Sequence, residues 1–208
     1  MRNIILTSQG KALLDSGSVI GYQDGLLPTG YKRLTGIGYD GNVYYDTGLY
    51  LHGSDTLRFA FEATKACNVL GCYTSADAQT NYSYYASTTS SAKYMRYNGG
   101  TYNSYIVTNK RYDIVVTPTG CSGGQVDSTW TSKTFTTAST LMLGTTSYGA
   151  TSAKLTGRMH GDVVIDGMAH IMACEDPYGR IGYYILEEER FLPNLGTGTP
   201  TSLGYLSE

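Results

Sequence analysis

From residue 27 onward, short apolar segments recur along the chain, separated by Gly, Asn, Asp and Ser. Several of them alternate apolar and polar residues, which is the period of a strand with one buried face. Leu57, Phe59 and Phe61 form such a set. Few stretches have the apolar period of a helix, and the one weak helical candidate, residues 184–190, equally fits a strand that runs into a polar turn. The pattern predicts an all-β protein, an antiparallel two-sheet β-sandwich.

Turn signals lie between these segments. In "LPTG", Pro28 excludes a helix and Gly30 permits a positive φ angle. Asn98-Gly99-Gly100 is a typical hairpin turn, because the central positions of such turns favour positive φ. Gly123-Gly124 predicts a further turn. The spacing of these turns agrees with many short antiparallel strands.

The composition supports a β domain with a polar but weakly charged surface. A chain of 208 residues usually forms one domain, and 41% hydrophobic residues suffice for a core. Tyrosine dominates the aromatic residues, with 20 Tyr against 4 Phe and 1 Trp. It suits half-buried strands and is also a common recognition residue. With a net charge of −2, the chain has no overall attraction to nucleic acid, so no nucleic-acid partner is expected.

Residues 1–26 differ from the rest, because their short apolar clusters, separated by Gly and Ser, are too small to form a core. We predict a short N-terminal arm that attaches the protein to another one, followed by the β-sandwich at residues 27–208. The first apolar run is too short for a signal peptide, and no later run reaches the length of a membrane span. We therefore expect folding in a cytoplasm, without a signal peptide and without membrane insertion.

Four cysteines, Cys67, Cys72, Cys121 and Cys174, form no CxxC pair that would indicate a zinc site. A disulfide between Cys67 and Cys72 is one alternative. Unpaired buried thiols are favoured, because free cysteine packs as a small apolar residue.

Two stretches carry a resemblance to a known family. The opening "LPTGYKRLTGIGYDGNVYYDTGLYL" resembles the start of a group of phage and prophage proteins of gut bacteria, through Leu27, Pro28, Gly30, Tyr31, Tyr44, Tyr45, Asp46, Thr47 and Gly48. The ending is similar too, through Cys174, Gly179, Gly182, Tyr183, Phe191 and the "GTGT" of residues 196–199. These proteins look like concanavalin A-like lectin/glucanase (laminin-G-like) jelly-roll domains of virion surface and tail-associated proteins. The resemblance covers residues 27–204. It departs at Tyr184, often an Asp, and at Glu187–Glu189, often a Val-Asn-Gly turn.

The resemblance implies a jelly-roll sandwich whose first and last strands lie together. The ending would then be a closing strand pair, with Ile181, Tyr183 and Ile185 in a strand and Glu187–Arg190 in a polar turn. It also implies a virion protein made in the cytoplasm of a bacterial host and similar to a tail or head fibre. Its partners would be other virion proteins, bound through residues 1–26, and host or mucosal glycans. Virion fibres are often trimers, so a homotrimer is a further expectation, without a heptad repeat to enforce it.

No catalytic motif accompanies this fold. Glucanases of the fold place their carboxylates in a Glu-x-Asp-x-Glu motif, whose period of two puts all three on one face. The sequence lacks this motif, and Glu187–Glu189 are expected in a solvated turn. It also lacks Gly-x-Ser-x-Gly. His160 and Asp162 share one strand face, but a structural histidine is favoured over half of a catalytic triad. We therefore expect a non-enzymatic protein. The alternatives are a structural decoration or connector protein of the virion that binds no sugar, and a glycan hydrolase.

Two sets of residues are candidates for binding. The tyrosine-rich region offers rings that stack on sugar faces, and its candidate residues are Tyr82, Tyr84, Tyr85, Tyr94, Arg96, Tyr97, Tyr102 and Tyr105. Some of these rings could instead fill the sandwich, since Tyr82 and Tyr84 share one strand face. The family resemblance adds a calcium site, because laminin-G-like domains sometimes bind this ion through loop oxygens. Its candidates are Asp40, Asn42 and Asp46, and no other cofactor is expected.

Overall fold

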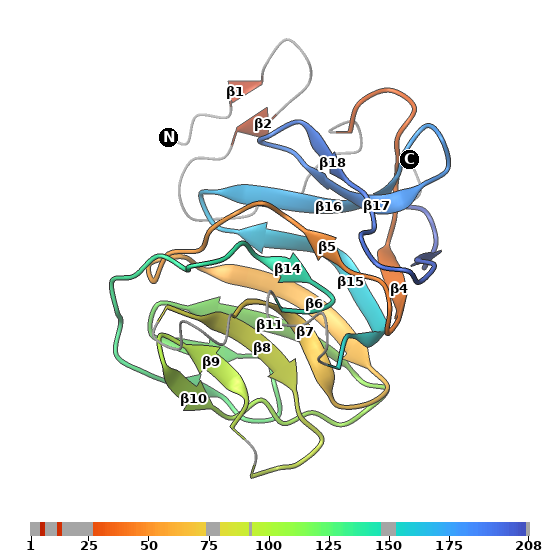
Figure 1. Ribbon diagram of the computed structural model, residues 1–208. Coiled ribbons are helices and arrows are strands. Elements are labelled where there is room, and N and C mark those ends of the chain that lie inside the picture. Colours follow the sequence, from red (N-terminus) through yellow and green to blue (C-terminus); the bar gives the residue numbers. More distant parts are fainter. Residues whose placement is uncertain are drawn as a thin grey trace.

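The computed structural model describes residues 27–73, 80–91, 93–146 and 153–206, together with the backbone of two short paired strands, β1 (Ile5–Leu6) and β2 (Ala12–Leu13). These described residues contain strands, turns and irregular segments, and no helix. The all-β class expected from the sequence is confirmed (Figure 1). The predicted attachment role of residues 1–26 lies outside the described residues, apart from the backbone of β1 and β2.

The remaining described strands form two antiparallel sheets, neither of which closes into a barrel. One is six-stranded, in the order β10 (Gly100–Tyr102), β9 (Met95–Tyr97), β8 (Tyr82–Ala86), β7 (Cys67–Cys72), β14 (Met142–Leu143) and β5 (Tyr45–Asp46). The other is eleven-stranded, and its main path runs through β13 (Ser128–Thr129), β12 (Gly120–Ser122), β11 (Arg111–Thr117), β6 (Leu57–Ala63), β15 (Thr156–Ile165), β16 (Ala169–Glu175), β17 (Ile181–Ile185) and β18 (Arg190–Leu192). Off this path, β3 (Lys32–Arg33) pairs with β16, and β4 (Gly36–Asp40) pairs with β15 and with β19 (Thr201–Ser202).

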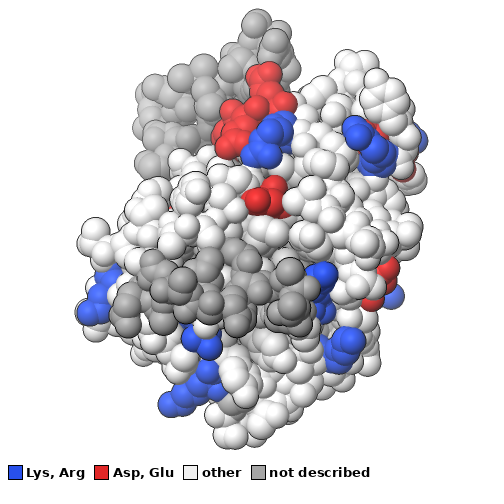
Figure 2. All heavy atoms as spheres, viewed as in Figure 1, with Lys and Arg blue, Asp and Glu red and all other residues white. Residues whose placement is uncertain are grey.

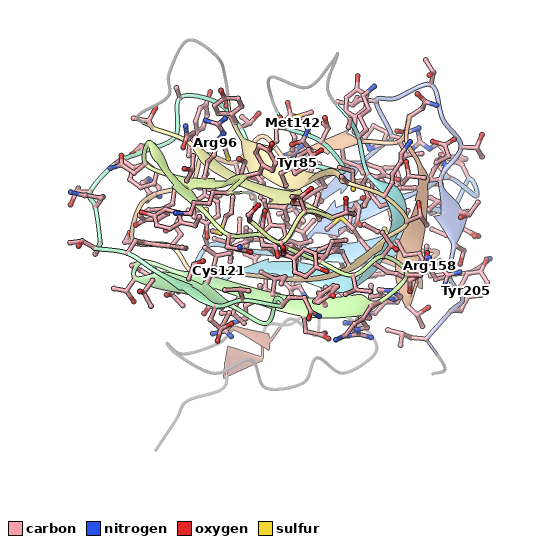
Figure 3. The ribbon with its side chains drawn as sticks, turned by 90° about the horizontal axis from the view of Figure 1, so that it is seen from below. Tyr85, Arg96, Cys121, Met142, Arg158 and Tyr205 are labelled. Atoms are coloured by element: carbon pink, nitrogen blue, oxygen red, sulfur yellow. The ribbon has the colours of Figure 1, made fainter. Side chains whose placement is uncertain are left out.

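The two sheets face one another across a shared core, which is consistent with the predicted β-sandwich (Figures 1 and 3). On β6, Leu57, Phe59 and Phe61 are buried, as their alternation predicted. The ring of Tyr84, from β8 of the opposite sheet, lies 5.5 Å from that of Phe59 and 5.6 Å from that of Phe61, in edge-to-face contacts. Such a pair contributes about 0.5–1.5 kcal/mol beyond its buried area. Aromatic contacts therefore join the two sheets at this point.

Two of the predicted turns have the expected backbone. Asn98 and Gly99 form the two-residue loop between β9 and β10, with φ angles of 46° and 78°. Positive φ at both positions is the geometry that favours Asn-Gly in hairpins. At the start of the described region, the Tyr31 amide donates a hydrogen bond to the Pro28 carbonyl at 3.1 Å, and Gly30 has a φ of 90°.

The strand pair that was predicted near the end of the chain is formed. β17 and β18 form a hairpin with Tyr184 opposite Phe191, and Glu187–Glu189 lie in its turn. Arg190, which was predicted in the turn, is instead the first residue of β18 and pairs with Ile185. The helical alternative for residues 184–190 is therefore wrong. Beyond this hairpin β19 pairs with β4, so that Thr201 lies opposite Gly38. The last described strand thus lies beside one of the first.

All four cysteines are buried and unpaired, so the prediction of free thiols is confirmed and the Cys67–Cys72 disulfide is not formed. Burial raises the pKa of the Cys67 thiol to about 11 and that of Cys72 to about 12. Both thiols are therefore protonated at neutral pH and act as small apolar side chains.

Candidate functional site

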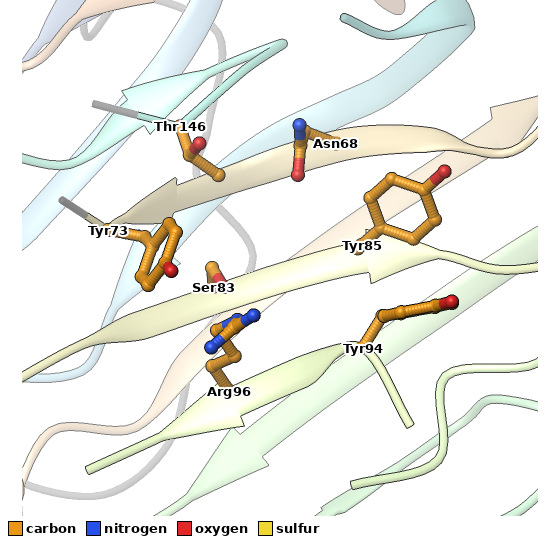
Figure 4. Close-up of a pocket in the computed structure, with 7 residues that line it drawn as sticks. All are labelled: Asn68, Tyr73, Ser83, Tyr85, Tyr94, Arg96 and Thr146. Carbon is orange, nitrogen blue, oxygen red and sulfur yellow. The ribbon is translucent and has the colours of Figure 1, made fainter. Parts of the chain in front are cut away.

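A hollow of about 190 Å³ lies over β7, β8 and β9, on the face of the six-stranded sheet that points away from the other sheet (Figures 3 and 4). Tyrosine rings, one arginine and small polar side chains line it. These residues are Asn68, Tyr73, Ser83, Tyr85, Tyr94, Arg96 and Thr146.

The two-residue period of the strands decides which side chains reach this face. On β8, Tyr82 and Tyr84 are buried in the core, and Ser83 and Tyr85 alternate with them toward the outer face. Arg96, on β9, lies opposite Ser83 in the strand register. The alternation thus brings Ser83, Tyr85 and Arg96 to one surface from two neighbouring strands.

A glycine leaves room between β7 and β8. Gly71 lies opposite Ser83, with a φ of 156°. A Cβ atom added at Gly71 would lie 2.5 Å from the Cβ of Ser83, closer than two such atoms pack. The close approach of the two strands below the hollow therefore depends on this glycine.

The aromatic rings of the hollow are held by one another and by the arginine. The rings of Tyr85 and Tyr94 lie 5.2 Å apart in an edge-to-face contact, and the side chain of Tyr94 is 51% exposed. The guanidinium of Arg96 lies 4.4 Å from the centre of the Tyr73 ring. Burial is the main cause that raises the pKa of the Tyr85 hydroxyl, so this group is a hydrogen-bond donor at neutral pH. The hollow thus offers apolar ring surface beside several hydrogen-bonding groups.

Of the residues predicted from the sequence, Tyr85, Tyr94 and Arg96 line the hollow together. Tyr102 and Tyr105 are half-buried elsewhere, Tyr102 against Trp130 with 4.6 Å between ring centres. Sequence reasoning missed the other lining residues, Asn68, Tyr73, Ser83 and Thr146.

Three further candidates need correction because they lie inside the core. Tyr82, Tyr84 and Tyr97 are only 1%, 2% and 2% exposed. The hydroxyl of Tyr97 donates a hydrogen bond to the Gly53 carbonyl at 2.7 Å. These rings fill the space between the sheets and offer no face to an external ligand.

The carboxylates of two candidate calcium residues, Asp40 and Asp46, accept hydrogen bonds from backbone amides. Asp40 accepts hydrogen bonds from the Asn42 amide at 2.8 Å and from the Thr199 amide at 3.2 Å. Asp46 accepts one from the Gly48 amide at 2.9 Å. In the part of the chain that the structure describes, no three His, Cys, Asp or Glu residues are grouped to hold a metal ion. Calcium binding at Asp40, Asn42 and Asp46 stays a prediction.

A separate polar cluster lies between β3, β15 and β16. The Asp162 carboxylate accepts a hydrogen bond from Arg33 at 2.6 Å and lies 2.7 Å from Nε2 of His170, whose side chain is 2% exposed. Burial by itself would raise the pKa of Asp162, but the hydrogen bond with His170 and the charges of His170 and Arg33 lower it below its ordinary value. His160 lies instead 3.9 Å from the Glu62 carboxylate. Asp162 is thus paired with His170, and the cluster ties three strands together.

The described residues include no helix with the length and apolar character of a membrane-spanning segment. Comparisons with protein-family models, with curated proteins and with solved structures find no significant match to this chain.

Proposed function

We propose that this protein binds glycans without modifying them, and that the hollow over β7, β8 and β9 is its sugar site. The observation that carries the proposal is the set of tyrosine rings, with an arginine and small polar side chains, around one hollow on an outer sheet face. A pyranose has C–H faces that pack on aromatic rings, and a rim of hydroxyls that bond to polar side chains. Tyr85 and Tyr94 supply the ring surface, and Asn68, Ser83 and Arg96 supply the polar groups.

The size of the hollow fits one sugar ring. Its 190 Å³ is below the roughly 300–1,000 Å³ of pockets that enclose drug-sized ligands. At roughly 0.3 kcal/mol per non-hydrogen atom, a hexose of about twelve such atoms binds with a dissociation constant on the order of a few millimolar. Tight attachment then requires several copies acting together, as in a multivalent fibre.

The wider proposal concerns where the protein works. We propose a concanavalin A-like jelly roll on the surface of a phage or prophage virion, attached to other virion proteins through residues 1–26 and made in the host cytoplasm. The family resemblance at both ends of residues 27–204 supports it, as does the pairing of β4 with β19. A homotrimer would provide the several copies that weak single sites need.

The test is a panel of monosaccharides titrated against the labelled protein and followed by NMR chemical shifts, with and without calcium. Binding that Tyr94→Ala and Tyr85→Ala each abolish is the expected result. Tyr50→Ala is the matched control, because Tyr50 is 50% exposed, close to the 51% of Tyr94, and does not line the hollow.

Two other outcomes favour different functions. A folded protein that binds no sugar in either condition favours a structural decoration or connector protein. Release of reducing sugar, lost on replacing one particular acidic residue, favours a glycan hydrolase.

A further inference from the structure

We infer that the sugar bound in this hollow carries a carboxylate, and that Arg96 is the residue that selects it. The inference rests on the proposed glycan binding and adds the class of ligand. It starts from the charge of Arg96, which the other residues of the hollow leave unbalanced.

Arg96 differs from the other described arginines in its partners. Each of the others lies within ion-pair distance of a carboxylate, namely Arg33, Arg58, Arg111, Arg158, Arg180 and Arg190. Arg96 has no carboxylate within that distance among the described residues, and its contact is the ring of Tyr73. Its cationic group is therefore available to an external anion.

The contact with Tyr73 holds the guanidinium in place for this role. The centre of the Tyr73 ring lies 4.4 Å from the guanidinium carbon, and the ring attracts the positive charge of the group. The N–H groups at the edge of a guanidinium can donate to a planar acceptor. A carboxylate matches that edge with two parallel hydrogen bonds, which a neutral hydroxyl cannot do. Figure 4 shows the Arg96 side chain between Tyr73 and the Tyr85–Tyr94 pair, so an anion on Arg96 lies beside the stacking rings.

The surrounding chain adds positive charge. Between Glu62 and Arg111 the sequence has a single acidic residue, Asp77, against the basic residues Lys65, Lys93, Arg96 and Lys110. In the view of Figure 2, most acidic side chains lie near the hairpin of β17 and β18. Lys and Arg side chains lie around the half of the molecule that contains β8, β9 and β10. An approaching anion therefore meets little repulsion from fixed charges on this half.

The test compares sugars that differ only at C6. Methyl glucuronide is titrated against methyl glucoside, and methyl galacturonide against methyl galactoside, by NMR at low and moderate NaCl. We expect at least one uronate to bind about 10-fold or more tightly than its neutral partner, because hydrogen bonds between charged groups are stronger than those of a neutral hydroxyl. Added salt should reduce this preference.

Two variants locate the effect. Arg96→Gln should remove the preference for the uronate, so that the acidic sugar and its neutral partner bind alike, and Arg96→Lys should keep part of the preference, because an ammonium holds a carboxylate without the paired geometry. Arg111→Gln, which removes an exposed arginine on β11, should change nothing. Spectra of each variant show that it is folded.

The failures are distinguishable. Neutral and acidic partners that bind equally, both lost in Tyr94→Ala, overturn the inference and leave the sugar site standing. Acetate that competes as strongly as the uronate also overturns it, because the rings then contribute nothing to the recognition of an acidic sugar. No binding by any of the sugars overturns the inference together with the proposed function.

Discussion

Replacing Asp162 by alanine tests whether its cluster holds β3, β15 and β16 together. The carboxylate bonds to Arg33 on β3 and to His170 on β16, and the side chains of Asp162 and His170 are 11% and 2% exposed. Removing one partner of a buried ion pair costs about 3–5 kcal/mol, because the remaining charge has lost its compensation. For a domain of this size that loss lowers Tm by roughly 6–20 °C.

The way in which the destabilisation by Asp162→Ala changes with pH tests the cluster more specifically than its size at one pH. The pKa of Asp162 is lowered in the folded protein, although burial opposes the shift, because His170 and Arg33 favour the charged carboxylate. A carboxyl with a depressed folded pKa contributes stability that is present above its unfolded pKa, about 3.9, and is lost as pH falls through the folded pKa. The difference in free energy of unfolding between wild type and Asp162→Ala should therefore have its full size at pH 5 and shrink below about pH 4.

Urea unfolding, followed by the fluorescence of Trp130, measures this difference at each pH. Asp113→Ala is the control, because the side chains of Asp113 and its partner Arg111 are 68% and 56% exposed. An exposed pair of this kind is worth about 0–1 kcal/mol. Two results would refute the reasoning. One is an equal loss of free energy of unfolding in Asp162→Ala and Asp113→Ala, and the other is a loss in Asp162→Ala that stays the same down to pH 3.

Three further predictions concern the core, a turn and the thiols. Tyr84→Ala should cost about 3–5 kcal/mol in urea unfolding, whereas Tyr94→Ala should stay within about 0.5 kcal/mol, and equal effects would contradict the assigned burial. Gly99→Val should cost about 1–3 kcal/mol, since its φ is 78°, and an unchanged unfolding midpoint would show that the turn tolerates a side chain. Cys67 and Cys72 should resist a thiol reagent at pH 8 until urea unfolds the protein, because burial holds their pKa values at about 11 and 12. Rapid labelling of the native protein would contradict this.

Local patterns predicted much of the fold. The alternation of Leu57, Phe59 and Phe61 identified a strand with one buried face, and Asn98-Gly99 identified a hairpin. Both signals lie within a few residues of sequence, so neighbouring residues suffice to recognise them. The order of the strands depends instead on contacts between distant segments, and no local pattern specifies it.

The candidate site was only partly predictable for the same reason. The alternation of side chains along a strand places Tyr82 and Tyr84 on one face of β8 and Tyr85 on the other. It does not say which face points into the core, because both faces carry tyrosine. Tyr73 directly follows β7, where the register with β8 shifts between Asn68 and Leu70. Such a bulge changes which residues face outward, and the sequence gives no clear signal for it. Thr146 follows β14, far along the chain, and only strand order brings it to the hollow.

The pairing of β19 with β4 has a consequence for how the protein is made. Thr201 must meet Gly38 across most of the chain, so the eleven-stranded sheet cannot be completed until residue 201 has left the ribosome. Until then β4 has one unpaired edge, which can capture a strand from a neighbouring chain during synthesis. Contacts this distant in sequence also slow folding, to milliseconds or seconds in comparable β domains. On polysomes, unfinished copies of the chain lie close together. Pairing of β4 with a strand of a neighbouring copy is therefore most favoured at this stage.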